Sequence, residues 1–339
     1  MKKIIFFCTI WILLLISCNQ HSDNDVIFVD LTPCIVIDEL SDSTLFRGIS
    51  YMFNNNDVIY ATDDLNGRIL KLNTDLNLLG TIGKSGQGSH EFAGIGALSI
   101  WKDTILAVNL GGLSLNAYTD YGQYIDRYSF TNDPSLTVYS FCIDNEGYIY
   151  FTSLLDSFPV IKYDRKMNRQ FGFGEWIEPE NKQFRIFLNN FIPFYFDNKI
   201  LTLQVDAPVI NMYGKDGQHL MRKELPTKLF RKRLLFKQNE QKKDAANKRK
   251  VYKLFSSITS INNKIFILYV DHDKDNRPFK NKVVELLYEN NDFIIKKVYN
   301  LSQSNKDWFE SIVVTEDNKI IASNASMLVN PSISVYQLD

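Results

Sequence analysis

The sequence predicts an all-β fold, a six-bladed β-propeller that carries one helical insertion. Three observations support this prediction: short β-rich runs recur along the chain, Asp- and Asn-rich turns separate them, and the two shortest intervals between units match the period of four-stranded blades, while the longer ones carry insertions. The length of 339 residues would allow two average domains, but a propeller commonly accommodates such a length in a single repeated body.

The chain begins with a segment typical of a bacterial lipoprotein signal peptide. Met1–Lys3 is a basic start, and Ile4–Ile16 is an almost wholly apolar run. A helix of this length reaches only about 20 Å, which is short of the ~30 Å hydrocarbon layer of a bilayer. The run Leu15–Cys18 resembles the bacterial lipobox, so we expect removal of residues 1–17 and lipidation of Cys18. The alternative is an ordinary secretory leader that happens to end near a cysteine.

Residues 18–25 are polar and predict a flexible tether between the lipid and the folded body. Asn19 follows the cysteine, where an Asp would indicate inner-membrane retention by resemblance to Gram-negative lipoproteins. We therefore expect a lipid-anchored protein of the cell envelope, at the outer membrane, with its periplasmic or surface face undetermined.

The clearest repeat unit spans residues 48–82 and contains four short β-rich runs separated by turn clusters. Five further units follow, and one residue in each second strand marks them at intervals of 44 to 65 positions. The markers are Tyr60, Leu106, Tyr150, Leu201, Phe266 and Ile321. The third strands are expected at Arg68–Asn73, Leu113–Tyr118, Val160–Asp164, Val209–Tyr213, Val283–Tyr288 and Ser332–Leu338.

The sixth unit ends after three strands, because the chain stops at Asp339. An open ring would leave unpaired strand edges, so a strand from the N-terminal runs Val26–Leu31 or Cys34–Leu40 should complete this blade and close the ring. Residues 26–339 then form one propeller, and we expect it to be a monomer.

Between the fourth and fifth units, the segment Lys228–Lys253 carries eleven Lys and Arg residues against Glu240 and Asp244. Apolar residues gather at its start, from Leu229 to Phe236, which predicts a helical insertion at about residues 226–252 with an apolar foot. The helix could pack over one face with its basic side in water. Alternatively, it could dock an anionic partner such as lipid phosphates or an acidic glycan.

The segments Asp63–Leu72 and Ile82–Phe92 carry an Asp…Asn-x-Arg-Ile pattern followed by a glycine-rich link. In these segments the chain resembles six-bladed propellers of the NHL-repeat and TolB-like type, although Ser89–His90 stands where such links commonly have Pro-Gly. The resemblance implies the fold. It also raises the alternative of a sugar-lactonase-like hydrolase or lyase, whose propeller holds a divalent cation on its axis.

Each expected second strand ends near an Asp or Asn, and in a propeller these ends share one face. The residues are Asp64, Asn109, Asp156, Asp206, Asp271 and Asn324. Short polar side chains at such positions commonly satisfy backbone groups of the following turn. The sharper hypothesis is that some of them line a central mouth that binds a cation, Ca²⁺ above all, or a hydroxyl-rich ligand.

Composition limits the remaining function classes. The 39 acidic and 38 basic residues nearly balance, which argues against nucleic acid as a partner. Cys34 and Cys142 are too few for a disulfide scaffold, and the scattered histidines do not have the spacing of a zinc site. Without a nucleophile–base pair or metal triad, we expect a binding or scaffold protein for a protein or glycan ligand, with no cofactor; the cation-dependent enzyme remains the alternative.

Overall fold

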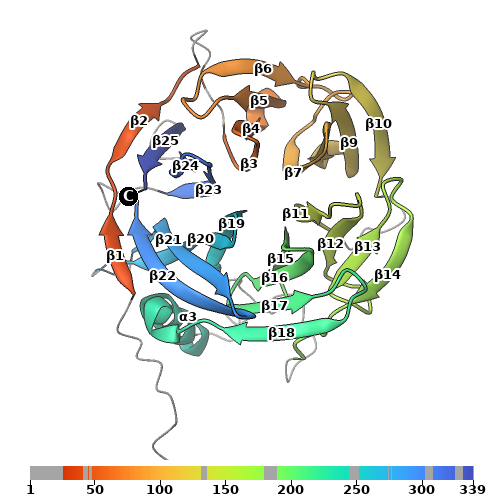
Figure 1. The fold of residues 1–339 in the computed structure, drawn as a ribbon. Coiled ribbons are helices and arrows are strands. Elements are labelled where there is room, and N and C mark those ends of the chain that lie inside the picture. The colour runs from red at the N-terminus through yellow and green to blue at the C-terminus, as the bar shows by residue number, and fades with distance from the viewer. Residues whose placement is uncertain are drawn as a thin grey trace, which may run out of the picture.

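The computed structural model describes residues 26–40, 45, 48–130, 136–178, 189–243, 252–273, 275, 277–301, 308–324 and 331–338. Six sheets stand around a central axis, which confirms the six-bladed propeller (Figure 1). Within each blade, four strands run antiparallel from the centre to the rim. The leader, Cys18 and the tether lie outside the described residues, so their assignment stays a prediction.

The strand bounds follow the repeat units. Blade 1 contains β3 (Met52–Asn55), β4 (Val58–Asp63), β5 (Arg68–Leu72) and β6 (Leu78–Ile82), and blade 2 contains β7 (Ile95–Trp101), β8 (Thr104–Asn109), β9 (Ser114–Thr119) and β10 (Tyr124–Ser129). Blade 3 contains β11 (Leu136–Ile143), β12 (Ile149–Ser153), β13 (Val160–Tyr163) and β14 (Arg169–Phe173), and blade 4 contains β15 (Phe191–Phe196), β16 (Lys199–Gln204), β17 (Val209–Tyr213) and β18 (His219–Glu224). Blade 5 contains β19 (Phe255–Ile261), β20 (Lys264–His272), β21 (Pro278–Glu289) and β22 (Asp292–Asn300), and blade 6 contains β23 (Phe309–Val314), β24 (Lys319–Asn324) and β25 (Ser332–Gln337).

Burial explains the composition of the strands. The second and third strands lie between neighbouring blades, so both of their faces are covered, and β17 is buried along its whole length. Outer strands have one wet face, and β18 accordingly alternates between exposed and half-buried residues. The core therefore consists of apolar layers between successive blades, such as the cluster that joins blades 4 and 5.

The N-terminal segment closes the ring, as the sequence predicts. β2 (Pro33–Ile37) pairs antiparallel with β25 and supplies the outer strand of blade 6. β1 (Ile27–Asp30) pairs parallel with β22 and adds a fifth strand to blade 5. Of the two N-terminal runs, the second forms the clasp and the first extends the neighbouring blade along the rim (Figure 1).

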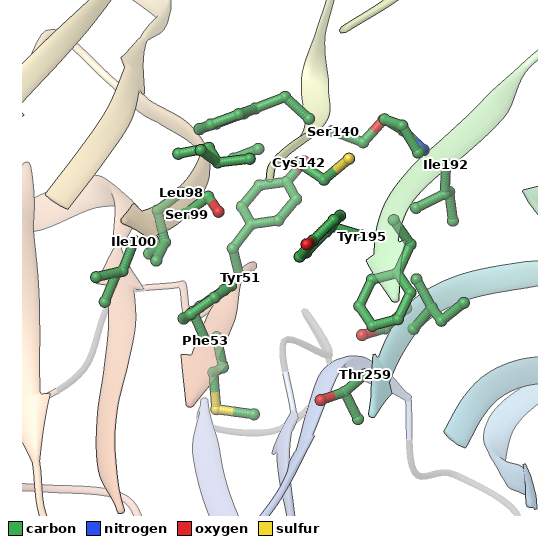
Figure 2. Close-up of a pocket in the computed structure, with 18 of the residues that line it drawn as sticks. Tyr51, Phe53, Leu98, Ser99, Ile100, Ser140, Cys142, Ile192, Tyr195 and Thr259 are labelled. Atoms are coloured by element: carbon green, nitrogen blue, oxygen red, sulfur yellow. The ribbon is translucent and has the colours of Figure 1, made fainter. Parts of the chain in front are cut away.

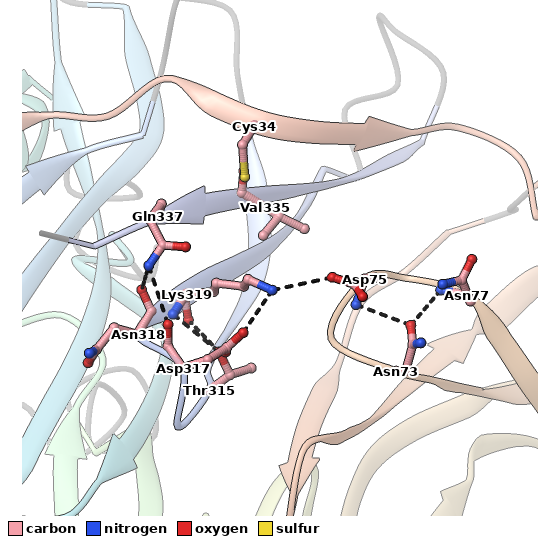
Figure 3. A network of polar contacts seen from close by, with 10 residues as sticks. All are labelled: Cys34, Asn73, Asp75, Asn77, Thr315, Asp317, Asn318, Lys319, Val335 and Gln337. Carbon is pink, nitrogen blue, oxygen red and sulfur yellow. Dashed lines mark hydrogen bonds and ion pairs between the residues drawn. The ribbon is translucent and has the colours of Figure 1, made fainter.

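Polar contacts reinforce this closure (Figure 3). The Cys34 thiol donates to the carbonyl of Val335 at 3.3 Å. Lys319 of blade 6 lies 2.7 Å from Asp317 in its own turn and 3.3 Å from Asp75 of blade 1. The last blade is therefore tied to the N-terminal strand through its backbone and to the first blade through a lysine.

The insertion between blades 4 and 5 is helical, as predicted. It consists of the short 3₁₀ segment η5 (Thr227–Phe230) and the helix α3 (Arg231–Lys243). Phe230 is buried, with its ring about 5 Å from those of Phe255 and Tyr269, which confirms the apolar foot. None of the helices in the described part of the chain is long and apolar enough to cross a bilayer.

Candidate functional site

A channel of about 550 Å³ runs along the propeller axis. Residues from the first strand of all six blades line it, and Figure 2 shows side chains from several of these strands converging on the same space. The first strands have no partner strand on their inner edge, so the channel wall combines strand edges with side chains. The fold thus builds this site from six distant parts of the sequence.

The channel wall combines apolar and hydroxyl side chains. Tyr51, Phe53 and Tyr195 contribute aromatic rings from blades 1 and 4, while Ser140 and Thr259 contribute hydroxyls from blades 3 and 5 (Figure 2). Apolar walls with a few convergent polar groups are typical of small-molecule sites in proteins.

Hydroxyl groups also connect the inner strands to one another. The Ser311 hydroxyl accepts a hydrogen bond from the backbone N–H of Met52 at 3.0 Å, across blades 6 and 1. The Ser257 hydroxyl accepts from the N–H of Ile312 at 3.2 Å, across blades 5 and 6. These contacts satisfy backbone groups on inner strand edges and hold the wall in a fixed geometry.

The described channel wall carries two charged side chains of opposite sign, Lys102 and Asp144. Its carboxylate, Asp144, is 1% exposed and accepts hydrogen bonds from the Tyr150 hydroxyl and from the N–H groups of Glu146 and Tyr148, each at 2.9 Å. Burial raises the pKa of the Cys142 thiol well above its ordinary value, so this sulfur stays protonated. The channel is therefore suited to a neutral ligand.

The six residues predicted for a mouth all lie at or just beyond the ends of second strands. Because these strands run in the same sense around the ring, the residues share one face of the propeller. The set is Asp64 in the 3₁₀ segment η2 (Asp64–Asn66), Asn109 at the end of β8, Asp156 after β12, Asp206 after β16, Asp271 in β20 and Asn324 at the end of β24. None of the six belongs to the channel wall.

Basic side chains hold three of these carboxylates within or beside their own blades. Asp156 binds both guanidinium nitrogens of Arg169, and Asp271 lies 2.8 Å from Lys282. Asp206, nearly buried, lies 2.6 Å from Lys237 of α3. Within the described ranges, no group of three or more His, Cys, Asp or Glu side chains is arranged to hold a metal ion.

Two further mouth residues, Asn109 and Asp64, differ in their surroundings. The Asn109 side chain donates to the carbonyl of Glu91 and accepts from the N–H of Ala93, so it fixes the link from blade 1. Asp64 accepts a hydrogen bond from the Ser50 hydroxyl, and burial raises the pKa of its carboxyl to about 6. The Asp64 carboxyl can therefore change its protonation state near neutral pH. A ligand-binding role for the six residues stays a prediction.

Sequence reasoning missed a buried charge pair between blades 5 and 6. Lys280 lies near the start of β21, and its ammonium lies 2.5 Å from Glu310 of β23 and 4.8 Å from the centre of the Trp308 ring. Burial lowers the pKa of Lys280 to about 8. No sequence pattern predicted this pair, because its members are 30 positions apart and belong to different repeat units.

The histidines of the described chain lie away from the channel wall. His272 is the last residue of β20 and is fully buried. Its ring stacks on Phe236 of α3 at 4.5 Å, and burial with the nearby Arg233 lowers its pKa to about 4. The helix therefore covers this end of blade 5 and shields the His272 ring from water.

Comparison with known proteins supports the fold. No family model matches the chain, and no curated protein matches its sequence. A Bacteroides fragilis protein designated as exported has a similar structure, with a TM-score of 0.55 and 12% identity over 92% of this chain and 98% of that one. A catalytically inactive virginiamycin B lyase from Staphylococcus aureus, solved with quinupristin, has a TM-score of 0.51 and 13% identity over 90% and 99%. A Bacteroides thetaiotaomicron protein of unknown function has a TM-score of 0.55 and 9% identity over 91% and 74%. At these identities the likeness concerns the propeller fold alone.

Proposed function

We propose that this protein is a lipid-anchored, extracytoplasmic binding propeller whose axial channel holds a neutral, hydroxyl-bearing ligand such as a short glycan segment. The proposal depends on one observation, a channel of about 550 Å³ walled by aromatic rings and hydroxyl groups, whose two charged side chains are of opposite sign. That volume lies within the range of about 300–1,000 Å³ usual for small-molecule sites.

The chemistry of the wall favours a ligand with both apolar faces and hydroxyl groups. The rings of Tyr51 and Tyr195 offer flat apolar surfaces that also carry a polar tip. The hydroxyls of Ser140 and Thr259 can either donate or accept a hydrogen bond. Sugar rings present apolar C–H faces and hydroxyl edges, so they match both kinds of group.

Binding is better supported than catalysis. Asp144 is already occupied by three hydrogen bonds, and the Cys142 thiol stays protonated, so neither side chain is ready to act as base or nucleophile. The similar fold of the virginiamycin B lyase keeps a hydrolase or lyase as the second candidate. The observation that favours it is Asp64, whose pKa of about 6 suits an acid–base group.

Calorimetry with a panel of neutral disaccharides and trisaccharides tests the binding proposal. Thr259→Trp places a large ring in the channel and is expected to abolish the binding heat. Thr81→Trp makes the same change at an exposed position of the outer strand β6 and should leave it intact. Heats that both variants retain, or a panel without any heat, would count against the channel as a sugar site.

The anchor is tested separately. Cells that express the full chain are expected to hold it in the membrane pellet and to incorporate a fatty-acid label into it. Cys18→Ser should release the protein to the soluble fraction without the label. A pellet unchanged by this substitution would refute lipid anchoring while leaving the channel proposal intact.

A further inference from the structure

Ion pairs join neighbouring blades at five of the six junctions. They are Lys71–Asp120 between blades 1 and 2, Glu146–Lys215 between 3 and 4, Lys223–Asp292 between 4 and 5, Lys280–Glu310 between 5 and 6, and Lys319–Asp75 between 6 and 1. The described residues of blades 2 and 3 form no such pair. This junction is therefore the exception in the ring.

Equivalent positions show what a closed junction looks like. In blade 1, Tyr60 on the second strand is paired in register with Lys71 on the third. Both reach across to Asp120, in the turn after the third strand of blade 2: the Tyr60 hydroxyl donates to its carboxylate, and the Lys71 ammonium lies 2.7 Å from it. Two long side chains and one carboxylate thus fill the space between the blades.

The same positions carry different chemistry between blades 2 and 3. The register pair in blade 2 is Leu106 with Ala117, so shorter side chains replace the Tyr and Lys of blade 1. Asp120 lies three positions after Ala117, and the residue three positions after the corresponding Lys162 of blade 3 is Arg165. A guanidinium therefore lies where the junction of blades 1 and 2 has the Asp120 carboxylate.

The truncation leaves a pocket of about 520 Å³. Leu106, Ala117, Tyr128 and Ile143 contribute largely apolar walls, and Trp101 separates the pocket from the axial channel. Its volume is close to that of the channel, although it is a distinct site. The wall is apolar enough to hold the body of a small organic molecule.

Positive charge gathers at the rim of this pocket. Arg165 and Lys166 line it, and the Arg165 guanidinium stacks on the Trp101 ring at 4.5 Å. Gly147 permits this arrangement, since a Cβ there would lie 2.9 Å from Trp101 and 3.0 Å from Arg165. Aromatic stacking holds the guanidinium in place without neutralising it.

No carboxylate of the described chain forms an ion pair with Arg165 or Lys166. Asp164 is adjacent, but its carboxylate accepts hydrogen bonds from the N–H groups of Lys166 and Asn168 and from the Asn168 side chain. The rim therefore has two cations beside an apolar pocket and an anion position left open. A carboxylate, sulfonate or phosphate would make charge-assisted hydrogen bonds to such a guanidinium.

We propose that the pocket between blades 2 and 3 binds a small organic anion with an apolar body. The anionic group pairs with Arg165, at the position that the Asp120 carboxylate takes one junction earlier, and the body packs on Leu106, Ala117 and Tyr128. This site is independent of the axial channel and of any ligand held there.

Fluorescence titration with anilinonaphthalene sulfonate tests the proposal, with phenylnaphthylamine as the same probe without its sulfonate. We expect one sulfonate-probe site in the protein. Arg165→Ala should weaken its affinity at least tenfold and leave the uncharged probe nearly unchanged. Lys242→Ala, which removes an exposed charge on α3, is the matched control and should change neither probe.

A second variant fills the pocket with the two side chains that the fold has at the equivalent positions of blades 1 and 3. Leu106→Tyr combined with Ala117→Lys recreates the register pair of blades 1 and 3, and it should abolish binding of both probes while the unfolding transition is kept. Undiminished binding in this variant, or equal loss of both probes in Arg165→Ala, would overturn the proposal. So would loss of the sulfonate probe in the channel variant Thr259→Trp, because the probe would then sit on the axis.

Discussion

The closing strand offers a direct test of how the ring is held. Leu40 follows β2 and is 3% exposed, in an apolar cluster with residues of blades 1 and 6 such as Ile49 and Val335. Val36 lies on the same segment but is 57% exposed. We predict that Leu40→Ala strongly destabilises the whole propeller, whereas Val36→Ala does not.

The structure sets the size of the two effects. Cutting a fully buried leucine to alanine costs about 2–5 kcal/mol, because the transfer free energy and the cavity both count. An exposed substitution usually stays within about 0.5 kcal/mol. With a urea dependence of about 3 kcal/mol per molar, the Leu40 variant should lose about 1 M in its midpoint of unfolding.

Urea unfolding, followed by fluorescence and circular dichroism together, measures this difference. Deleting residues 26–40 extends the test, since it removes β1 and β2 and leaves β25 with an open edge. That deletion should abolish cooperative unfolding, because the net stability of a domain is only about 5–15 kcal/mol. Equal shifts for both point variants, or unchanged unfolding of the truncated chain, would refute the clasp.

Three further predictions concern charged groups. The folded protein retains a proton on Asp64 that the unfolded chain loses, so its free energy of unfolding should fall as pH rises from about 4 to about 6. Asp64→Asn should remove this pH dependence and raise the free energy of unfolding by up to about 3 kcal/mol at pH 7, as measured by urea unfolding. Lys237→Met leaves the nearly buried Asp206 without its cation and should lower the free energy of unfolding by about 3–5 kcal/mol, whereas Lys242→Met should have little effect. Equal losses of stability in the two variants would contradict the buried pair. Calcium titration should give no binding heat, because lysine and arginine side chains already occupy three of the mouth carboxylates, and a clear one-site isotherm would reverse that conclusion.

Much of the fold could be predicted from local patterns. All six marker residues lie in second strands, and Val209–Tyr213 was predicted with the bounds that the structure gives to β17. Turn chemistry explains this success: Asp- and Asn-rich turns favour positive φ angles, as at Asn198 and Asn318, so strand ends are visible in the sequence. The N-terminal closure followed from counting strands in the last unit, but the choice between two apolar runs needed the observed register.

The site was harder to predict, since its residues come together only through the ring. The channel wall takes residues from all six first strands, and the sequence marked none of them as special. Polar residues at the ends of second strands were visible, but their partners, such as Lys237 of the insertion for Asp206, lie far away in the chain. A sequence pattern can locate a carboxylate, but it does not show which cation forms an ion pair with it in the folded protein.

The pocket between blades 2 and 3 shows how a departure from the repeat pattern can leave space for a ligand. Each blade must cover its neighbour, so the repeat unit favours residues that fill the junction, as Tyr60 and Lys71 do. At Leu106 and Ala117 the chain departs from this pattern and leaves apolar surface uncovered, beside the Arg165 guanidinium, which has no carboxylate partner among the described residues. A ligand that fills the space should therefore also stabilise the ring, because it binds the folded protein and not the unfolded chain. Raising the concentration of the sulfonate probe should therefore raise the unfolding temperature of the protein, but not that of the filled variant.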